Sequence, residues 1–363
     1  MVTVVTTVLM VATGFVCATW NHFFANPGIP AWQILLPSMT AAFIVVTVVS
    51  MRSSNLGLRF TYQISAIWLG VLNLVFFAAC LAWMASLVIA LLSFHFSSES
   101  VASLCFLAAL LVSAYGFINA SWLRVTRLTV HLENLPANWN GGTLALVTDM
   151  HLGNFRGAGF SRRVVNKLNQ LRPRAVLISG DLFDGTSGDL EALVAPWKKL
   201  NPQTAAYFVT GNHEEFGDRQ KFLEAVKGAG IRVLENEMVE NQGLQIVGVH
   251  DAESGDPDLF RKTLRDAGVD RGRASILLAH QPGNLSIAEE EGISLQVSGH
   301  THGGQMWPWT LLAARVHGRF NHGLNRLGRL LVLTSYGVGT WGAPMRLGTH
   351  SEMVLIQLAA SKT

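Results

Sequence analysis

Charged residues are almost missing from the first third of this chain. Up to residue 123 the only charged side chains are Arg52, Arg59 and Glu99. A water-soluble domain of that size carries many more charges on its surface, so this part of the sequence is not typical of a soluble domain. We therefore expect two parts: residues 1–123, built for a hydrophobic environment, and residues 124–363, built for water.

The chain also contains few cysteines and carries a small net charge. Cys17, Cys80 and Cys105 are the only cysteines, so the second part of the chain has no disulfide framework and gives no sign of an oxidising compartment. The formal net charge is only +3 at pH 7. Because a nucleic-acid-binding surface normally needs a stronger basic field, we expect no nucleic-acid partner.

Long apolar runs occupy most of the first part. Four of them approach the length of about 20 residues needed to cross a hydrocarbon core: residues 2–24, 32–51, 64–92 and 101–122. A cleaved signal peptide is the alternative for the first run, but that run lacks a basic leading segment and is followed by more apolar runs. Buried helices of a soluble core are the alternative for all four, and the scarcity of charge argues against them. The sequence predicts a transmembrane region of four helices.

Basic residues predict the orientation of these helices. Arg52 and Arg59 lie between the second and third runs, and Arg124 and Arg127 follow the fourth run. The other two connections, one of them near residue 25, contain neither Lys nor Arg. Since basic loops favour the cytoplasmic side, we expect a multi-pass protein of the inner (cytoplasmic) membrane whose second part faces the cytoplasm.

Beyond residue 123, short apolar runs alternate with helix-like segments. The runs that read as buried strands are 143–149, 175–181, 205–212, 244–251, 275–280, 295–300, 331–337 and 352–358. Helical segments are expected near 160–171, 189–200, 217–229 and 257–268, and residues 124–142 read as a short connection. This alternation predicts an α/β fold, in which ligands bind beyond the carboxyl ends of the strands.

Acidic, amide and imidazole side chains gather where these strands end. The set comprises Asp149, His151, Asp181, Asn212, His213, His280, His300 and His302. Oxygen and imidazole donors without thiolates suit hard or borderline divalent cations, and the set is large enough for two cations that share one carboxylate. Any one of these residues alone is more often a cap or a surface residue, so the prediction of a metal site rests on their joint occurrence.

Five short blocks resemble those of a known family. They are TDMHLG (148–153), GDLFD (180–184), GNHE (211–214), LLAHQP (277–282) and GHTHGGQ (299–305). In order and spacing they are similar to the blocks of calcineurin-like metallophosphoesterases. The resemblance covers roughly residues 143–358 and implies a two-sheet sandwich flanked by helices. The GGQ after the last block and GVGTWGAPMRLG near 337–348 resemble a membrane-associated bacterial branch, part of which comprises UDP-2,3-diacylglucosamine hydrolases.

The resemblance implies a role for each residue of the set. Asp149, His151, Asp181 and His302 would hold one cation, and Asp181, Asn212, His280 and His300 would hold the second, with Asp181 as the bridge. His213 would protonate or stabilise the leaving oxygen, and Asp184 would orient this histidine or neighbouring ligands. A simple Asx turn is the alternative for Asp184. Manganese, iron or zinc would fit these donors.

Residues 306–329 mix Trp307, Trp309 and several leucines with arginines that include Arg315 and Arg319. Apolar rings beside guanidinium groups suit a surface that enters anionic headgroups. An ordinary core segment with a basic edge is the alternative.

Together these observations predict a membrane-anchored phosphohydrolase with two divalent cations. Its expected partners are the bilayer and a phosphate ester or pyrophosphate of a membrane lipid or lipid precursor, UDP-2,3-diacylglucosamine among them. Two alternatives remain open: a phosphodiesterase that acts on soluble nucleotides or cyclic diesters, and a non-enzymatic membrane sensor of a phosphate ligand.

Overall fold

A computed structural model describes residues 2–24, 31–93, 95–216 and 218–361. The chain divides into two compact units. The first comprises Met1–Ala120 with the short segment Gly342–Met345, and the second comprises Ser121–Trp341 with Arg346–Thr363.

Four long apolar helices form the first unit. They are α1 (Val2–Phe24), α2 (Trp32–Ser50), α3 (Leu56–Leu91) and α4 (Ser98–Ser121), and each is long and apolar enough to cross a membrane. The predicted transmembrane region is therefore confirmed as four candidate spans. The connection at residues 25–30, which entered the prediction of orientation, lies outside the described residues.

The third helix begins before the predicted residue 64. Its first residue is Leu56, because the Asn55 side chain accepts a hydrogen bond from the Leu58 N–H at 2.9 Å and so caps the first turn. The helix therefore includes the polar stretch around Arg59, which precedes the apolar run at residues 64–92.

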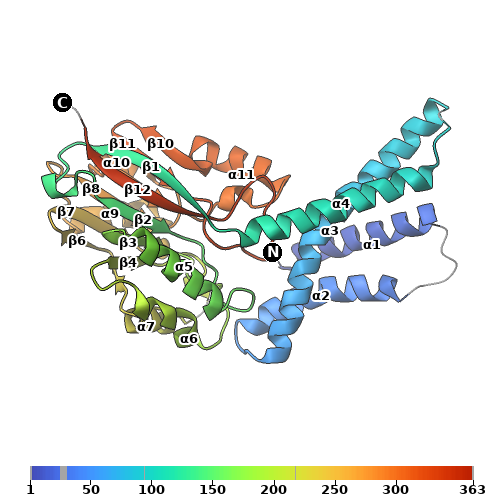
Figure 1. Ribbon diagram of the computed structural model, residues 1–363, viewed down its shortest axis with the longest axis horizontal. Coiled ribbons are helices and arrows are strands. Elements are labelled where there is room, and N and C mark those ends of the chain that lie inside the picture. The colour runs from blue at the N-terminus through green and yellow to red at the C-terminus, as the bar shows by residue number, and fades with distance from the viewer. Residues whose placement is uncertain (1, 25–30, 94, 217, 362–363) are drawn as a thin grey trace. The chain divides into compact units, whose positions relative to one another are not determined.

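Two six-stranded mixed sheets form the centre of the second unit (Figure 1). The first sheet contains, in spatial order, β1 (Arg124–Leu132), β12 (Glu352–Ala360), β2 (Thr143–Val147), β3 (Ala175–Ser179), β4 (Ala205–Val209) and β5 (Arg232–Val233). The second contains β10 (Gly323–Leu327), β11 (Leu330–Thr334), β9 (Leu295–Ser298), β8 (Ser275–Ala279), β7 (Leu244–Val249) and β6 (Glu237–Asn241). β2, β3 and β4 pair in parallel, as do β7, β8 and β9. In each sheet, the carboxyl ends of these strands therefore lie along one edge.

The two sheets pack face to face because side chains alternate along each strand. Leu144 and Leu146 of β2 share a buried cluster with Ile276 and Leu278 of β8. Ala145, which points the opposite way, belongs to the cluster on the outer face of the first sheet. The main core of this unit is thus the layer between the sheets.

Helices cover the outer faces of both sheets. α5 (Ala158–Leu171), α6 (Leu190–Val194) and α7 (Arg219–Gly228) pack on the first sheet, and Figure 1 shows them on one side of β3 and β4. α9 (Pro257–Asp266) and α10 (Leu285–Glu290) pack on the second sheet. The predicted two-sheet sandwich flanked by helices is confirmed.

The prediction for residues 124–142 was wrong in part. Instead of a connection, Arg124–Leu132 forms β1, which pairs in parallel with β12 along its length. Only its last residues, such as Val130 and Leu132, are buried, and its polar first half hides the strand pattern. β6 and β10 were also not predicted, because both are polar edge strands.

A buried carboxylate joins three parts of the second unit. Glu352 at the start of β12 is only 1% exposed. It accepts hydrogen bonds from the Thr126 hydroxyl at 2.7 Å, the Ser335 hydroxyl at 3.1 Å and the Tyr336 N–H at 2.9 Å. Burial alone would raise the pKa of Glu352, but the ring nitrogen of His322, 3.0 Å away, the His350 side chain and the Tyr336 N–H hold that pKa below its usual range. Glu352 therefore ties β1, β12 and the segment after β11 together.

Glu352→Ala should lower the stability of the full chain. Each buried donor left without an acceptor costs about 1–3 kcal/mol, and roughly 2–4 °C of thermal midpoint is lost for each kcal/mol in a domain of this size. Thermal unfolding of the detergent-solubilised protein measures this. Gln357→Ala, at an exposed position of the same strand, should change the midpoint little. Equal midpoints for the two variants would contradict the role given to Glu352.

Candidate metal centre

The loops that follow the parallel strands carry the whole predicted set. Asp149 and His151 follow β2, Asp181 follows β3, Asn212 and His213 follow β4, His280 follows β8, and His300 and His302 follow β9. Segments far apart in the sequence thus deliver their polar side chains to one place.

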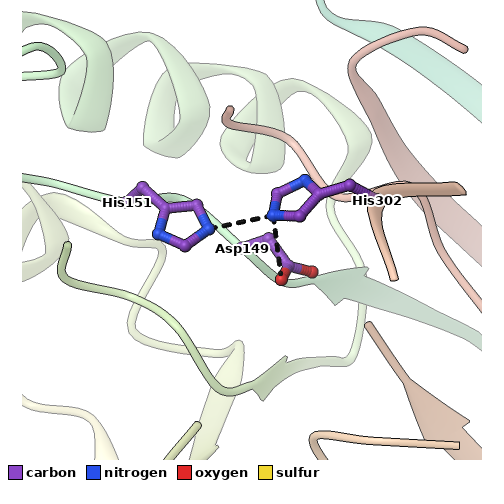
Figure 2. A group of neighbouring side chains, drawn as sticks. All are labelled: Asp149, His151 and His302. Atoms are coloured by element: carbon purple, nitrogen blue, oxygen red, sulfur yellow. Dashed lines mark hydrogen bonds and ion pairs between the residues drawn. The ribbon is translucent and has the colours of Figure 1, made fainter. Parts of the chain in front are cut away.

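A first group of ligand atoms surrounds one point (Figure 2). The Nε2 atoms of His151 and His302 are 3.0 Å apart, and His302 Nε2 is 3.5 Å from Asp149 Oδ1. His151 Nε2 is also 3.8 Å from Asp181 Oδ2. Ligands at about 2.0–2.2 Å from a cation stand roughly 3.0–3.6 Å from one another in tetrahedral or octahedral sites. Two of these three distances lie in this range and the third, at 3.8 Å, lies slightly above it, so the atoms can share one cation after a small adjustment.

A second group lies on the other side of Asp181. Its Oδ2 atom is 3.3 Å from His280 Nε2, which is 3.2 Å from His300 Nδ1. His300 Nδ1 is in turn 2.9 Å from the side-chain oxygen of Asn212. One oxygen of Asp181 is therefore within reach of both groups, as a bridging carboxylate requires.

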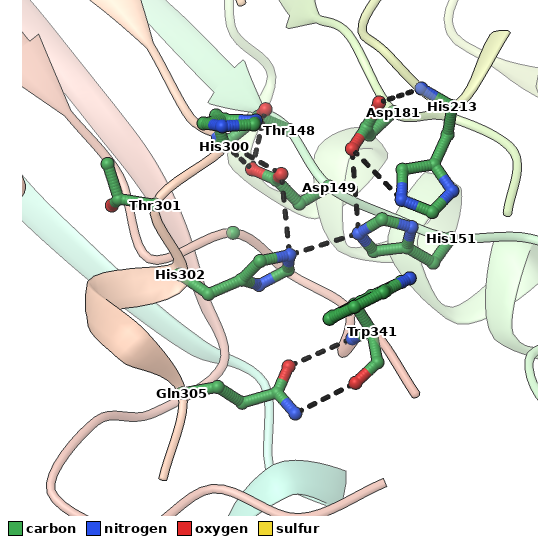
Figure 3. A network of polar contacts seen from close by, with 12 residues as sticks. Thr148, Asp149, His151, Asp181, His213, His300, Thr301, His302, Gln305 and Trp341 are labelled. Atoms are coloured by element: carbon green, nitrogen blue, oxygen red, sulfur yellow. Dashed lines mark hydrogen bonds and ion pairs between the residues drawn. The ribbon is translucent and has the colours of Figure 1, made fainter. Parts of the chain in front are cut away.

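Backbone carbonyls fix two of the histidine rings. His280 Nδ1 lies 2.8 Å from the Ser179 carbonyl oxygen, and His213 Nδ1 lies 2.9 Å from the Asp184 carbonyl oxygen. Since a carbonyl only accepts, each Nδ1 donates its hydrogen and each Nε2 is left to face the site. His213 Nε2 is 4.0 Å from Asp181 Oδ2, so His213 also lies within the range of the cluster (Figure 3).

The backbone carbonyl of Asp184 contacts His213, whereas the Asp184 side chain stabilises its own loop. The Asp184 carboxylate accepts hydrogen bonds from the Asn154 N–H at 3.0 Å and the Thr186 N–H at 2.9 Å, and from the Thr186 hydroxyl. The contact with Thr186 is an Asx turn. This turn fixes the loop whose carbonyl oxygen holds His213.

The backbone is strained at the residues that carry the ligand atoms. Asp149, His151, Asp181, His300 and His302 have φ angles of 54°, 47°, 50°, 67° and 47°. This left-handed region is uncommon for residues with a side chain, and each occurrence costs on the order of 1 kcal/mol. Such strain concentrated in one cluster indicates that the loops are shaped for function rather than for stability.

Two glycines let carboxylates approach the backbone closely. A Cβ atom on Gly211 would lie 2.2 Å from Asp181 Oδ1, and one on Gly299 would lie 2.2 Å from Asp149 Oδ2. Both glycines directly precede residues of the set. Any larger residue there would displace a carboxylate.

Glu214 is a residue of the site that sequence reasoning missed. It is fully buried, and its carboxylate accepts hydrogen bonds from the N–H groups of Asp181 at 3.0 Å, Phe183 at 2.9 Å and Gly211 at 2.7 Å. It thereby holds the loops after β3 and β4 together, while burial raises the pKa of Glu214 to about 8. Its place in the GNHE block, directly after His213, was the available signal.

Arg346 was missed as well. Its buried guanidinium donates to the Gly339 carbonyl oxygen at 2.7 Å and lies 3.1 Å from His302 Nδ1. Burial lowers the pKa of Arg346 to about 10, so it remains charged at neutral pH. The pKa of His302 is well below its usual value because of burial, then His151, then Arg346. A neutral imidazole is the form that binds metal.

Burial and the charge of Asp181 also shift the pKa values of other residues in the cluster. Burial raises the pKa of Asp149 to about 7 and lowers that of His300 to about 3. Burial alone would lower the pKa of His280, but the Asp181 carboxylate raises it to about 10. Conversely, burial alone would raise the pKa of Asp181, and His280 holds it below the usual range. Protons and cations therefore compete for the same atoms.

An aromatic rim lies beside His213. The rings of Trp341 and Phe216 are centred 6.1 Å and 4.8 Å from the His213 ring, although the two residues are 61% and 51% exposed. Gln305 holds the Trp341 backbone: its amide donates to the Trp341 carbonyl at 3.0 Å and accepts from the Trp341 N–H at 2.9 Å (Figure 3). Exposed rings held in place beside the cluster can bind an apolar part of a ligand.

Known proteins share this sequence pattern. The family model described as "Calcineurin-like phosphoesterase" matches residues 142–304. A transmembrane protein with metallophosphoesterase domain from Danio rerio is 33% identical and aligns over 72% of this chain and 65% of its own. An uncharacterized metallophosphoesterase from Helicobacter pylori is 32% identical over 65% of this chain and 64% of its own. One from Aquifex aeolicus is 31% identical over 69% of this chain and 97% of its own. The chain thus spans slightly less than two thirds of the first two relatives.

Competition with protons predicts how metal binding depends on pH. Asp149, with a pKa of about 7, and His280, with a pKa of about 10, must both lose a proton to act as ligands. Raising the pH removes the competing protons, so the affinity for Mn²⁺ should rise about tenfold or more between roughly pH 6 and pH 8. Calorimetric titration of the metal-free full chain, in buffers of different ionisation enthalpy, should also show proton release. A pH-independent affinity without proton release would contradict this.

Proposed function

Because this chain belongs to the calcineurin-like phosphoesterase family, we propose that it is a membrane-anchored phosphohydrolase with two divalent cations. Its substrate is a phosphate ester or pyrophosphate of a membrane lipid or lipid precursor. The observation that carries this proposal is the Asp181 carboxylate, whose Oδ2 atom is within reach of two separate groups of ligand atoms. When bound, the cations supply a nucleophile from water at neutral pH and neutralise charge on the phosphoryl group.

Two sets of side chains hold the two cations. The first cation is held by Asp149, His151, Asp181 and His302, and the second by Asp181, Asn212, His280 and His300. All donors are oxygen or imidazole nitrogen, which suits manganese, iron or zinc.

His213 is the proposed acid for the leaving group. Its Nδ1 atom is held by the Asp184 carbonyl at 2.9 Å, so its Nε2 atom faces the cluster. An imidazolium at that position can donate the Nε2 proton to the departing oxygen. Asp184 thereby acts as a positioning residue through its backbone.

A lipid-linked substrate is supported from two directions. Four helices are long and apolar enough to cross a membrane, and two relatives are named transmembrane proteins. Trp341 and Phe216 offer exposed aromatic surface on the His213 side, where a leaving group departs. UDP-2,3-diacylglucosamine combines a pyrophosphate with acyl chains and therefore belongs in a panel of test substrates.

The catalytic unit is proposed to face the cytoplasm from the inner membrane. Arg52 and Arg59 between the second and third helices, and Arg124 and Arg127 after the fourth, support this by the positive-inside rule. Protease protection in inside-out vesicles distinguishes the two orientations, since only an exposed catalytic unit is digested.

Two other functions make different demands on the site. A phosphodiesterase for soluble nucleotides or cyclic diesters would use the same cations and would stack a base on Trp341 instead of an acyl chain. A sensor of a phosphate ligand has no need of a leaving-group acid, so the placement of His213 favours an enzyme.

Asp181→Ala and His213→Ala should separate metal binding from turnover. Without Asp181 both ligand groups lose a shared oxygen, so the variant should lose bound metal and activity together. His213→Ala should keep its metal and lose about 10²- to 10⁴-fold in kcat, the usual contribution of an acid catalyst. Elemental analysis and hydrolysis of a chromogenic phosphodiester measure the two properties.

The matched control for these variants is Asp251→Asn. Asp251 also follows a strand and is buried, but its carboxylate accepts a hydrogen bond from Gln281 at 2.9 Å and is in none of the ligand groups. This variant should keep both metal and activity. A fully active Asp181→Ala enzyme would rule out the proposed centre.

Trp341→Ala should distinguish lipid from small substrates. Removing an aromatic contact with an acyl chain costs about 1–2 kcal/mol, so kcat/KM for an ester with long acyl chains should fall about tenfold. The value for the corresponding short-chain ester should change less than about twofold. Leu259→Ala, at an exposed apolar position on α9, is the control. Equal losses on both esters would remove the support that Trp341 gives to a lipid substrate.

A further inference from the structure

The helix α11 (Trp309–His317) exposes the apolar side chains of Leu311, Leu312 and Val316 within the part of the chain that the structure describes. All of its residues are described, and none of them is buried. Leu311, Leu312 and Val316 are 65%, 55% and 67% exposed. A helix on the surface of a globular domain normally turns its apolar residues inward, so α11 shows the reverse pattern.

The helical repeat places these residues on one outer face. At 3.6 residues per turn, Thr310, Ala313 and His317 share a side, and all three are partly buried. Leu311, Leu312, Arg315 and Val316 lie on the other side and are exposed. The outer face is therefore an aliphatic surface with an arginine within it.

Tryptophans and arginines extend this face at both ends. Trp307 and Trp309, at its start, are 46% and 50% exposed. Arg319 follows its end and lies over the Phe320 ring at 4.9 Å. Residues 306–329 contain neither Asp nor Glu. We refer to the exposed side chains of Trp307, Trp309, Leu311, Leu312, Arg315 and Val316 as the α11 surface.

We propose that the α11 surface docks onto an anionic lipid bilayer. Aliphatic side chains enter the boundary between headgroups and acyl chains, tryptophans prefer the interface, and arginines attract anionic headgroups. The absence of acidic residues from the segment suits an anionic partner. The candidate membrane spans would keep a bilayer close to the second unit, because α4 ends at Ser121 and β1 begins at Arg124. This link spans roughly 10 Å at most.

Docking would bring the bilayer close to the metal centre. α11 starts against the loop that carries His302: a Cβ atom on Gly304 would lie 2.4 Å from the Trp309 carbonyl oxygen. At the other end, the His317 ring is centred 6.4 Å from the His300 ring. A bilayer bound to the outer face of α11 would thus lie one helix diameter, roughly 10 Å, from these ligands. The proposal rests on membrane anchoring and not on the proposed hydrolysis.

Hydrogen exchange in lipid nanodiscs tests this proposal. The full-length protein is placed in discs of phosphatidylcholine alone, in discs that also contain phosphatidylglycerol, and in detergent micelles. The α11 amides should exchange about tenfold more slowly in the anionic discs than in micelles, with an intermediate rate in phosphatidylcholine. No activity is measured, so the result does not depend on the substrate.

Substitutions on the α11 surface test whether this surface causes the slower exchange. Leu312→Glu with Val316→Glu should abolish the slowing in every disc, because a charged face cannot enter the bilayer. Arg315→Glu with Arg319→Glu should remove only the difference between anionic and neutral discs. Leu259→Glu, at a 47% exposed position on α9, is the control and should behave like the wild type. Unchanged protection of β8 and β9 amides would show that each variant is folded.

Two results would overturn the proposal. Slow exchange of α11 that is the same in micelles and in both kinds of disc would assign the surface to the chain's own helices or to a second copy. Fast exchange in all three would show that nothing covers it.

Discussion

A single carboxylate, that of Asp181, lies between two groups of metal-ligand side chains, which the loops after β2, β4, β8 and β9 bring to it. Its Oδ2 atom is 3.8 Å from His151 Nε2 and 3.3 Å from His280 Nε2. Its own N–H is held by Glu214 at 3.0 Å. A buried negative charge is costly unless cations or protonated groups surround it, so this position commits the site to binding positive charge.

The fold explains how distant segments reach that carboxylate. Parallel strands of two sheets end along neighbouring edges, and short loops after them turn through left-handed conformations at Asp149, Asp181 and His300. The strain of these loops is offset by contacts such as the Gly211 and Phe183 N–H bonds to Glu214. The backbone strain that positions the ligand atoms therefore lowers the stability of the fold, as is common at functional sites.

Different parts of the structure were accessible to sequence reasoning to different degrees. The strands β2, β3 and β8 were predictable because each is a buried apolar run followed by a polar ligand type. β1 was missed because its first half is polar and it pairs with β12, more than two hundred residues away in the sequence. Glu214, Arg346 and Trp341 were missed as site residues because their roles depend on contacts between remote loops. Local sequence patterns therefore identify the side chains that can bind a metal. Contacts between distant segments determine which other residues hold those side chains in place and surround them.

The account stands or falls on two cations that share Asp181. The most direct measurement is electron paramagnetic resonance of the full chain loaded with Mn²⁺. Two ions bridged by one carboxylate lie about 3.5–4 Å apart, so the spectrum should be that of an exchange-coupled pair, and Asp181→Ala should abolish the coupling. A spectrum of isolated Mn²⁺ ions at full loading of the wild-type protein would contradict the account.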